Sequence, residues 1–79
     1  MQVRFYAVGR EIAGVDEARF DVDSFDALAS ALQARFGERM ARLAEASTFL
    51  RDGSRHRITD EVALSDADVV DLLPPFAGG

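Results

Sequence analysis

The hydrophobic spacing of this chain changes from a period of two to a helical period and back again within 79 residues. Apolar and polar side chains alternate over residues 2–8 and again over residues 17–23, which predicts two strands that each bury one face. The connection between them contains Gly9 and Gly14, so an antiparallel hairpin is expected. The side chains expected to face inward are Val3, Phe5, Ala7, Ala18, Phe20 and Val22.

The next segment has helical spacing and can supply the second layer that such strands need. Ser24 is expected to cap the first free amides, and Asp26 lies in the positively polarised first turn. Gly37 follows the last apolar position, where a left-handed terminating residue belongs. A second, shorter helix is expected over residues 38–46. The stripe of the main helix that should cover the sheet is Phe25, Leu28, Ala29, Leu32 and Phe36.

Strand signals return in the second half of the chain. Residues 48–51 form a predicted strand, Asp52-Gly53 is a hairpin-turn signal, and residues 55–58 would return beside that strand. Residues 59–67 are polar and turn-like, and the last strand is expected over residues 69–73. The side chains expected inside this half are Val62, Leu64, Val70 and Leu72, with Val69, Asp71 and Leu73 on the opposite face of the last strand.

The elements therefore follow the order strand, strand, helix, strand, strand, strand. One helical stripe is available to cover one apolar sheet face, which favours a mixed sheet of about five strands around one main helix, with a second short helix. This is an α+β fold of the β-grasp, ubiquitin-like architecture. The domain is expected over residues 1–75, and residues 76–79 are expected to form a flexible C-terminal tail.

Charge and composition exclude several classes of protein. The formal charge of −5 disfavours nucleic-acid binding and favours a partner with basic residues around its docking site. All nine basic residues are arginine, so the chain offers no lysine ε-amine to an activated carboxyl group. The absence of cysteine excludes disulfides and thiolate metal sites and fits a reducing compartment. Because the sequence also lacks a signal-peptide-like or membrane-spanning apolar run, a cytoplasmic location is expected.

Conventional catalytic groups are nearly absent. The single histidine, His56, lies between two arginines and is expected to be a solvated side chain of an edge strand. Asp66-Ala67-Asp68 lacks the remaining ligands of a calcium loop, so no metal site is expected. No glycine-rich phosphate loop follows a strand, because Gly9 and Gly14 have neither the spacing nor the lysine. We therefore expect no bound cofactor and no catalysis by this chain alone.

The last six residues form the feature that remains. Pro74 and Pro75 cannot donate ladder hydrogen bonds and favour an extended exit from the sheet. Gly78 and Gly79 carry no side chains, so this thin end of the chain fits a narrow pocket of another protein. A carboxylate at Gly79 is a poor electrophile, and transfer chemistry there requires activation, for which adenylation by ATP in a partner enzyme is the natural route.

The two ends of the chain resemble a known family. The ending Leu72–Gly79, with acidic residues entering the last strand, Pro-Pro and a terminal Gly-Gly, is similar to the small, sulfur-carrying subunit of molybdopterin synthase. The start also resembles that family, in Val3–Ala7 followed by Arg10-Glu11 and Gly14. The centre departs from it, because an asparagine-containing turn is common where this chain has Leu50–Gly53.

The resemblance implies a sulfur carrier. An adenylating, E1-like enzyme would consume ATP to convert the Gly79 carboxylate to an acyl-adenylate, and sulfur transfer would then give a Gly79 thiocarboxylate. The large subunit of molybdopterin synthase would use it to place sulfur on a pyranopterin precursor, within a heterotetramer. The alternatives are a sulfur carrier for thiamin, cysteine or tRNA thiolation, a ubiquitin-like covalent protein modifier, and a non-covalent binding module with an incidental diglycine.

Partner contacts are expected beside the tail. Tyr6 and Leu73 should lie on the sheet face away from the helix, where apolar side chains suit a protein interface. The whole expected partner-binding set is Tyr6, Leu73, Pro74, Pro75, Phe76 and Ala77, with Gly78 and Gly79 entering the partner's active site.

Overall fold

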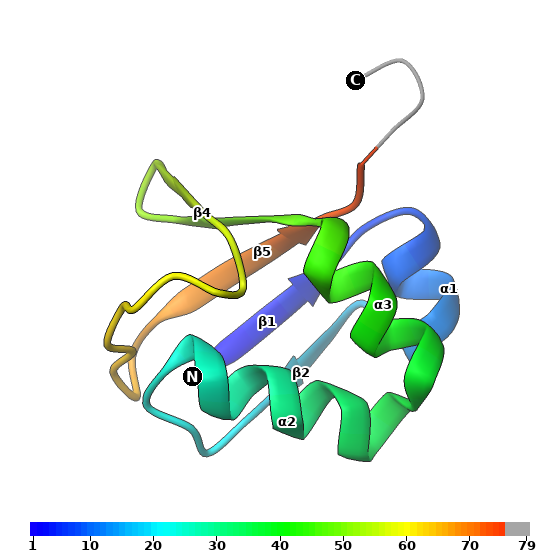
Figure 1. Cartoon of the computed structure of the whole chain (residues 1–79), viewed down its shortest axis with the longest axis horizontal. Coiled ribbons are helices and arrows are strands. Elements are labelled where there is room, and N and C mark those ends of the chain that lie inside the picture. The colour runs from blue at the N-terminus through cyan, green and yellow to red at the C-terminus, as the bar shows by residue number, and fades with distance from the viewer. Residues whose placement is uncertain (76–79) are drawn as a thin grey trace.

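The strands at the two ends of the chain lie side by side in the middle of one sheet (Figure 1). The computed structural model describes residues 1–75. β1 (Gln2–Phe5) pairs antiparallel with β2 (Glu17–Arg19) and parallel with β5 (Val69–Leu73). β3 (Thr48–Arg51) continues antiparallel from β5, and β4 (Ser54–His56) forms the far edge. Within residues 1–75 the sheet thus has five strands in the order β2-β1-β5-β3-β4, and the predicted mixed sheet is confirmed.

The main helix, α2 (Phe25–Phe36), forms as its sequence predicts. The Ser24 hydroxyl accepts a hydrogen bond from the Ala27 amide at 3.1 Å, which satisfies one of the free amides of the first turn. Gly37 has a positive φ of 90°, as expected, but its ψ of −171° is extended and not left-handed helical. The reason is that Gly37 ends α2 and at the same time precedes α3 (Glu38–Ala46), so the chain must turn sharply at this one residue.

The first predicted strand is too long. β1 ends at Phe5, and residues 8–13 form a short helix, α1 (Val8–Ala13), where a turn was expected. Ala7 was predicted to face inward but is exposed, with a positive φ of 51° that breaks the alternation before α1. Gly9 is buried inside this helix, and Gly14 closes it in the left-handed conformation. Gly9 therefore lies within a short helix, and Gly14 is the glycine that ends it.

The second hairpin is shorter than predicted, and its histidine side chain faces the core and not the solvent. Asp52 and Gly53 both adopt positive φ, as a tight two-residue turn requires, but β4 ends at His56. His56 was expected to be solvated, yet its side chain is only 17% exposed. Its ring packs 5.7 Å from the ring of Phe25 because the register places His56 opposite the buried Phe49.

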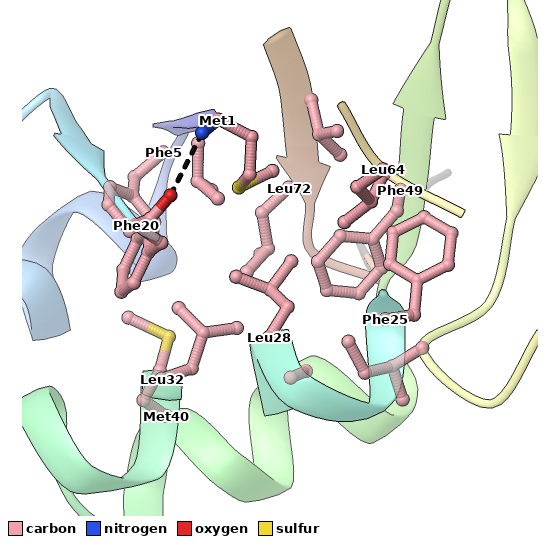
Figure 2. Packing of buried hydrophobic residues seen from close by; sticks show 14 residues of the cluster. Met1, Phe5, Phe20, Phe25, Leu28, Leu32, Met40, Phe49, Leu64 and Leu72 are labelled. Atoms are coloured by element: carbon pink, nitrogen blue, oxygen red, sulfur yellow. Dashed lines mark hydrogen bonds between the residues drawn. The ribbon is translucent and has the colours of Figure 1, made fainter. Parts of the chain in front are cut away.

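One continuous core fills the space between the sheet and the helices (Figure 2). The predicted inward residues of β1 and β5 and Phe25, Leu28 and Leu32 of α2 are fully or almost fully buried, whereas Ala29 and Phe36 of the predicted stripe are partly buried. Aromatic rings bridge the layers. Phe5 meets Phe36 edge to face at 5.5 Å, and Phe25 packs 5.6 Å from Phe49. Figure 2 also shows the Met1 ammonium group, which donates a hydrogen bond to the Phe20 carbonyl at 2.8 Å. On the other face of the sheet Arg4 and Val69 are exposed and Asp71 is only partly buried, so within residues 1–75 the helices cover one face.

In the part of the chain that the structure describes, no helix combines the length and the apolar character needed to cross a membrane.

Candidate functional site

The candidate site begins at β5, the strand from which the C-terminal residues emerge. β5 lies between β1 and β3, so both of its edges are hydrogen-bonded. Val70 and Leu72 are fully buried on its inner face, as predicted. This strand is therefore one of the best anchored elements of the sheet, and it gives the following residues a fixed base.

Pro74 packs into the domain and Pro75 does not. β5 ends at Leu73, the Pro74 side chain is buried, and Pro75 is exposed. Gly9 lies beside Pro74, because a methyl group built on Gly9 would be 3.8 Å from the Pro74 Cγ atom. The same position is 3.5 Å from a Leu43 methyl group and 3.4 Å from one of Leu72. α1, α3 and β5 thus meet at Gly9, and the Pro74 side chain packs at the edge of this contact.

This burial changes the interpretation of Pro74. It was predicted as a partner-binding residue, but a side chain buried within its own domain has little surface to offer a partner. Its packing instead sets the direction in which the chain leaves β5. Pro75 is exposed and is available for contact.

An ion pair joins the two central strands on the face away from the helices, which we call the open face. The Arg4 Nε atom donates to Asp71 Oδ1 at 2.6 Å, and Nη2 donates to Oδ2 at 3.1 Å. The Tyr6 hydroxyl donates to the same carboxylate at 3.3 Å. The hydrogen bond and the charge of Asp71 raise the pKa of the Arg4 guanidinium above its ordinary value.

The strand registers extend this pair into a row across the whole sheet. Arg4 lies opposite Glu17 on one side and Asp71 on the other, and Asp71 lies opposite Leu50. Leu50 in turn lies opposite Arg55. We call these five residues the central row of the open face. The central row presents alternating charges and one aliphatic side chain. A partner with a complementary arrangement of charges could recognise this surface.

Tyr6 and Leu73 are placed on the open face as predicted. Tyr6 is 37% exposed and follows β1, whereas Leu73 ends β5 opposite Thr48 and is half-buried. Phe5 and Leu72 are paired, so the residues that follow them lie at the same end of the sheet. Their role in an interface stays a prediction. The remaining predicted site residues, Phe76, Ala77, Gly78 and Gly79, lie outside the described residues.

Solved structures share this fold along nearly the whole chain. SAMP1 from Haloferax volcanii has a TM-score of 0.76 and 27% identity, and the match covers 99% of this chain and 97% of that one. The small archaeal modifier protein 1 from Methanosarcina acetivorans has a TM-score of 0.77 and 21% identity, with 99% and 94% covered. The chain is a ubiquitin-like β-grasp protein.

A third solved structure has the same β-grasp fold. A putative molybdopterin converting factor, subunit 1, from Pyrococcus furiosus has a TM-score of 0.73 and 21% identity, with 95% of each chain covered. At 21% identity the likeness is one of fold. No protein-family model matches the sequence, and no curated protein matches it. Together the structural neighbours establish the ubiquitin-like β-grasp fold of this chain.

Sequence reasoning missed three residues of the site in this β-grasp domain. Arg4 and Asp71 were each placed on an outward face, but nothing in the pattern showed that strands 67 residues apart are neighbours. A parallel pairing of the first and last strands was the missing information. Gly9 was interpreted as a turn residue, and its burial follows only from the helix that replaces that turn.

A second ion pair holds the loop that leads into β5. The Asp68 carboxylate accepts the Ser65 amide at 2.7 Å and lies 3.4 Å from an Arg51 Nη1 atom. The same Nη1 atom of Arg51 donates to the Ala63 carbonyl at 2.7 Å. The hydrogen bond from Ser65, supported by the charge of Arg51, holds the pKa of the Asp68 carboxyl below its ordinary value. These bonds fix the approach to β5 from the end opposite Pro74.

Among residues 1–75 no three His, Cys, Asp or Glu side chains converge in a way that would hold a metal ion.

Proposed function

We propose that this chain is a sulfur carrier that reacts at the carboxyl group of Gly79. The observation that supports this best is the end of β5. The central strand runs to Leu73, Pro74 is buried beside Gly9, and Pro75 is exposed. A carrier needs a rigid base and a defined point of departure for its reacting end, and this arrangement supplies both.

The reaction takes place in partner active sites. An E1-like enzyme transfers AMP from ATP to a Gly79 carboxylate oxygen and releases pyrophosphate. Hydrosulfide then attacks the acyl carbon, the bond to AMP breaks with AMP as the leaving group, and a Gly79 thiocarboxylate remains. ATP is consumed by the partner, and Gly78 keeps the approach narrow. The chain itself supplies the carboxyl group and the docking surface.

We propose the large subunit of molybdopterin synthase as the acceptor, with a pyranopterin precursor as the substrate and a heterotetramer as the working complex. The fold shared with a putative molybdopterin converting factor, subunit 1, supports this assignment, as do the Pro-Pro and Gly-Gly residues of the tail. The open face would meet the partner through Tyr6, Leu73 and the central row, while Pro75, Phe76 and Ala77 would line the entrance to its active site.

A covalent protein modifier is the second candidate. The specific observation in its favour is that the neighbour with 27% identity is SAMP1, and two further solved structures are named as small archaeal modifier proteins. An activated Gly79 would then join an amine of a target protein. Because this chain has no lysine, it offers no ε-amine for a second copy, and chains of copies linked through lysine would not form. A sulfur carrier for thiamin, cysteine or tRNA thiolation is the third candidate.

Intact mass spectrometry after co-expression with an E1-like enzyme separates these candidates. A mass change equal to the exchange of one terminal oxygen for sulfur supports the carrier, and mass ladders on other proteins support the modifier. Addition of the large synthase subunit and a pyranopterin precursor then distinguishes the molybdopterin pathway from other sulfur pathways. A chain that lacks Gly79 is the control and should fold normally without either product. If neither product forms with the full chain, both proposals are wrong.

A further inference from the structure

An open groove lies on the helix side of the domain, away from the open face. It has a volume of about 870 Å³ and runs between α2, α3 and residues 58–63, the loop after β4 that is yellow in Figure 1. Ala29 and Ala41 leave room between the two helices, and the almost fully buried Ala44 and Ile58 form part of the floor. The floor of the groove is therefore aliphatic and consists mostly of small side chains.

The charge along this groove has a single sign. No arginine lines it, whereas five carboxylates do, namely Asp23, Asp26, Glu45, Asp60 and Glu61. The chain has 14 acidic residues against nine arginines. The nine acidic residues outside the groove match the nine arginines in number, so the five groove carboxylates account for the formal charge of −5. We call this feature the acidic groove.

Most of these carboxylates have no internal partner. In residues 1–75 no ion pair involves Asp23, Asp26, Glu45 or Glu61. Asp60 alone is engaged, because it accepts the Arg57 amide at 2.9 Å and lies 3.6 Å from His56 Nδ1.

One arginine beside the groove is bound to a backbone oxygen. The Arg57 guanidinium donates to the Glu45 backbone carbonyl at 2.7 Å, and among residues 1–75 no ion pair involves the Glu45 carboxylate. Like charges held together around a low-dielectric floor attract cations strongly, and a bound cation would relieve their repulsion.

We propose that the acidic groove binds a segment of a partner protein that carries lysine and arginine side chains on one helical or extended face. The long aliphatic stems of these residues suit the floor of alanine and Ile58, and their charged ends reach the carboxylates at the rim. A divalent cation fits less well, because no three ligating side chains converge in the described part of the chain. Nucleic acid would be repelled by the same carboxylates.

This binding is independent of the carrier chemistry. The groove is built from α2, α3 and residues 58–63, whereas Arg4, Asp71 and Leu73 lie on the opposite face of the sheet. A partner on the open face and a basic segment in the acidic groove can therefore bind at the same time. The inference goes beyond the proposed function and does not depend on it.

The test is a titration of the isotopically labelled chain with a synthetic amphipathic peptide of arginine, leucine and alanine, followed by NMR amide shifts. We expect shifts confined to residues 23–33, 41–45 and 58–63 and strong weakening by salt. A peptide with glutamate in place of arginine is the matched ligand control. The variant Glu45→Gln/Glu61→Gln should weaken binding about fivefold, as expected for two partly exposed ion pairs.

The control variant Glu11→Gln/Glu17→Gln carries the same charge change outside the groove and should bind the peptide normally. Equal weakening by both variants, or shifts spread over the whole surface, would mean that attraction is by net charge alone and would overturn the proposal. Shifts in the groove caused by spermine or Mg²⁺ that the peptide cannot reverse would also overturn it, as would self-association through the groove. Thiocarboxylate formation by the groove variant should equal that of the unmodified chain.

Discussion

Arg4 and Asp71 form a two-point ion pair between the first and last strands, with donor–acceptor distances of 2.6 and 3.1 Å. The pair joins β1 to β5 two residues before β5 ends at Leu73. It also holds the Tyr6 hydroxyl, which donates to the same carboxylate. The Asp71 carboxylate thus fixes the positions of the Arg4 and Tyr6 side chains on the open face.

We first predict that Asp71→Asn weakens docking more than it weakens folding. The Arg4 side chain is 49% exposed, and exposed ion pairs contribute little to stability. The urea midpoint should change only slightly, whereas affinity for the E1-like enzyme should fall severalfold because Arg4 and Tyr6 lose their fixed positions. Calorimetric titration measures this loss. Arg4→Gln should add little to Asp71→Asn, and fully additive losses in this double-mutant cycle would contradict a coupled pair.

The second prediction concerns Gly9. A methyl group there would meet Leu72 and Leu43 at ordinary contact distances of 3.4 and 3.5 Å, so Gly9→Ala should be close to neutral. A larger side chain has no such room. Gly9→Leu should lower the free energy of unfolding by about 1–3 kcal/mol through overpacking. Urea denaturation of the two variants measures the difference, and a Gly9→Leu variant as stable as Gly9→Ala would show that α1 moves freely away from β5.

The two prolines should differ in their effect on sulfur transfer. Pro74 is buried beside Gly9 and fixes the exit from β5, whereas Pro75 is exposed. Pro74→Gly should therefore reduce the rate of thiocarboxylate formation severalfold, because the chain then leaves the sheet in many directions. Pro75→Gly should reduce it less, and it serves as the control. Rates come from intact mass spectrometry at timed intervals, with circular dichroism to confirm folding. The reverse order of effects would mean that Pro75 sets the direction.

The sequence was sufficient to predict what depends on local spacing. The extents of α2 and α3, the Ser24 cap and β5 follow from periodicity and cap chemistry, which act within a few residues. The Asp52-Gly53 turn was found in the same way. Its partner strand was displaced, because strand ends depend on which neighbour is available for pairing.

Properties that depend on long-range pairing were missed. α1 packs against Leu72 and Leu43 at Gly9, and neither residue is near Gly9 in sequence. His56 faces inward because its register with Phe49 puts it there, and flanking arginines suggested the opposite. The burial of Pro74 has the same origin. Each of these features arises from a contact between distant segments, which hydrophobic periodicity does not specify.

The last prediction is a pH dependence at the entrance to β5. Asp68 accepts the Ser65 amide and lies beside Arg51, and the pKa of its carboxyl is lowered in the folded chain. A lowered pKa means that the ionised carboxylate stabilises the fold above its unfolded pKa of about 3.9 and that this stabilisation is lost as the pH falls through the lower folded value. Asp68→Asn should therefore lower the free energy of unfolding by about 1 kcal/mol at neutral pH, as for one hydrogen bond. Denaturant unfolding should show this difference shrinking below about pH 4. Asp66→Asn, at a side chain that is 93% exposed, is the control and should show a much smaller effect. A difference for Asp68→Asn that grows on acidification would contradict the assigned role of the Ser65 amide and Arg51.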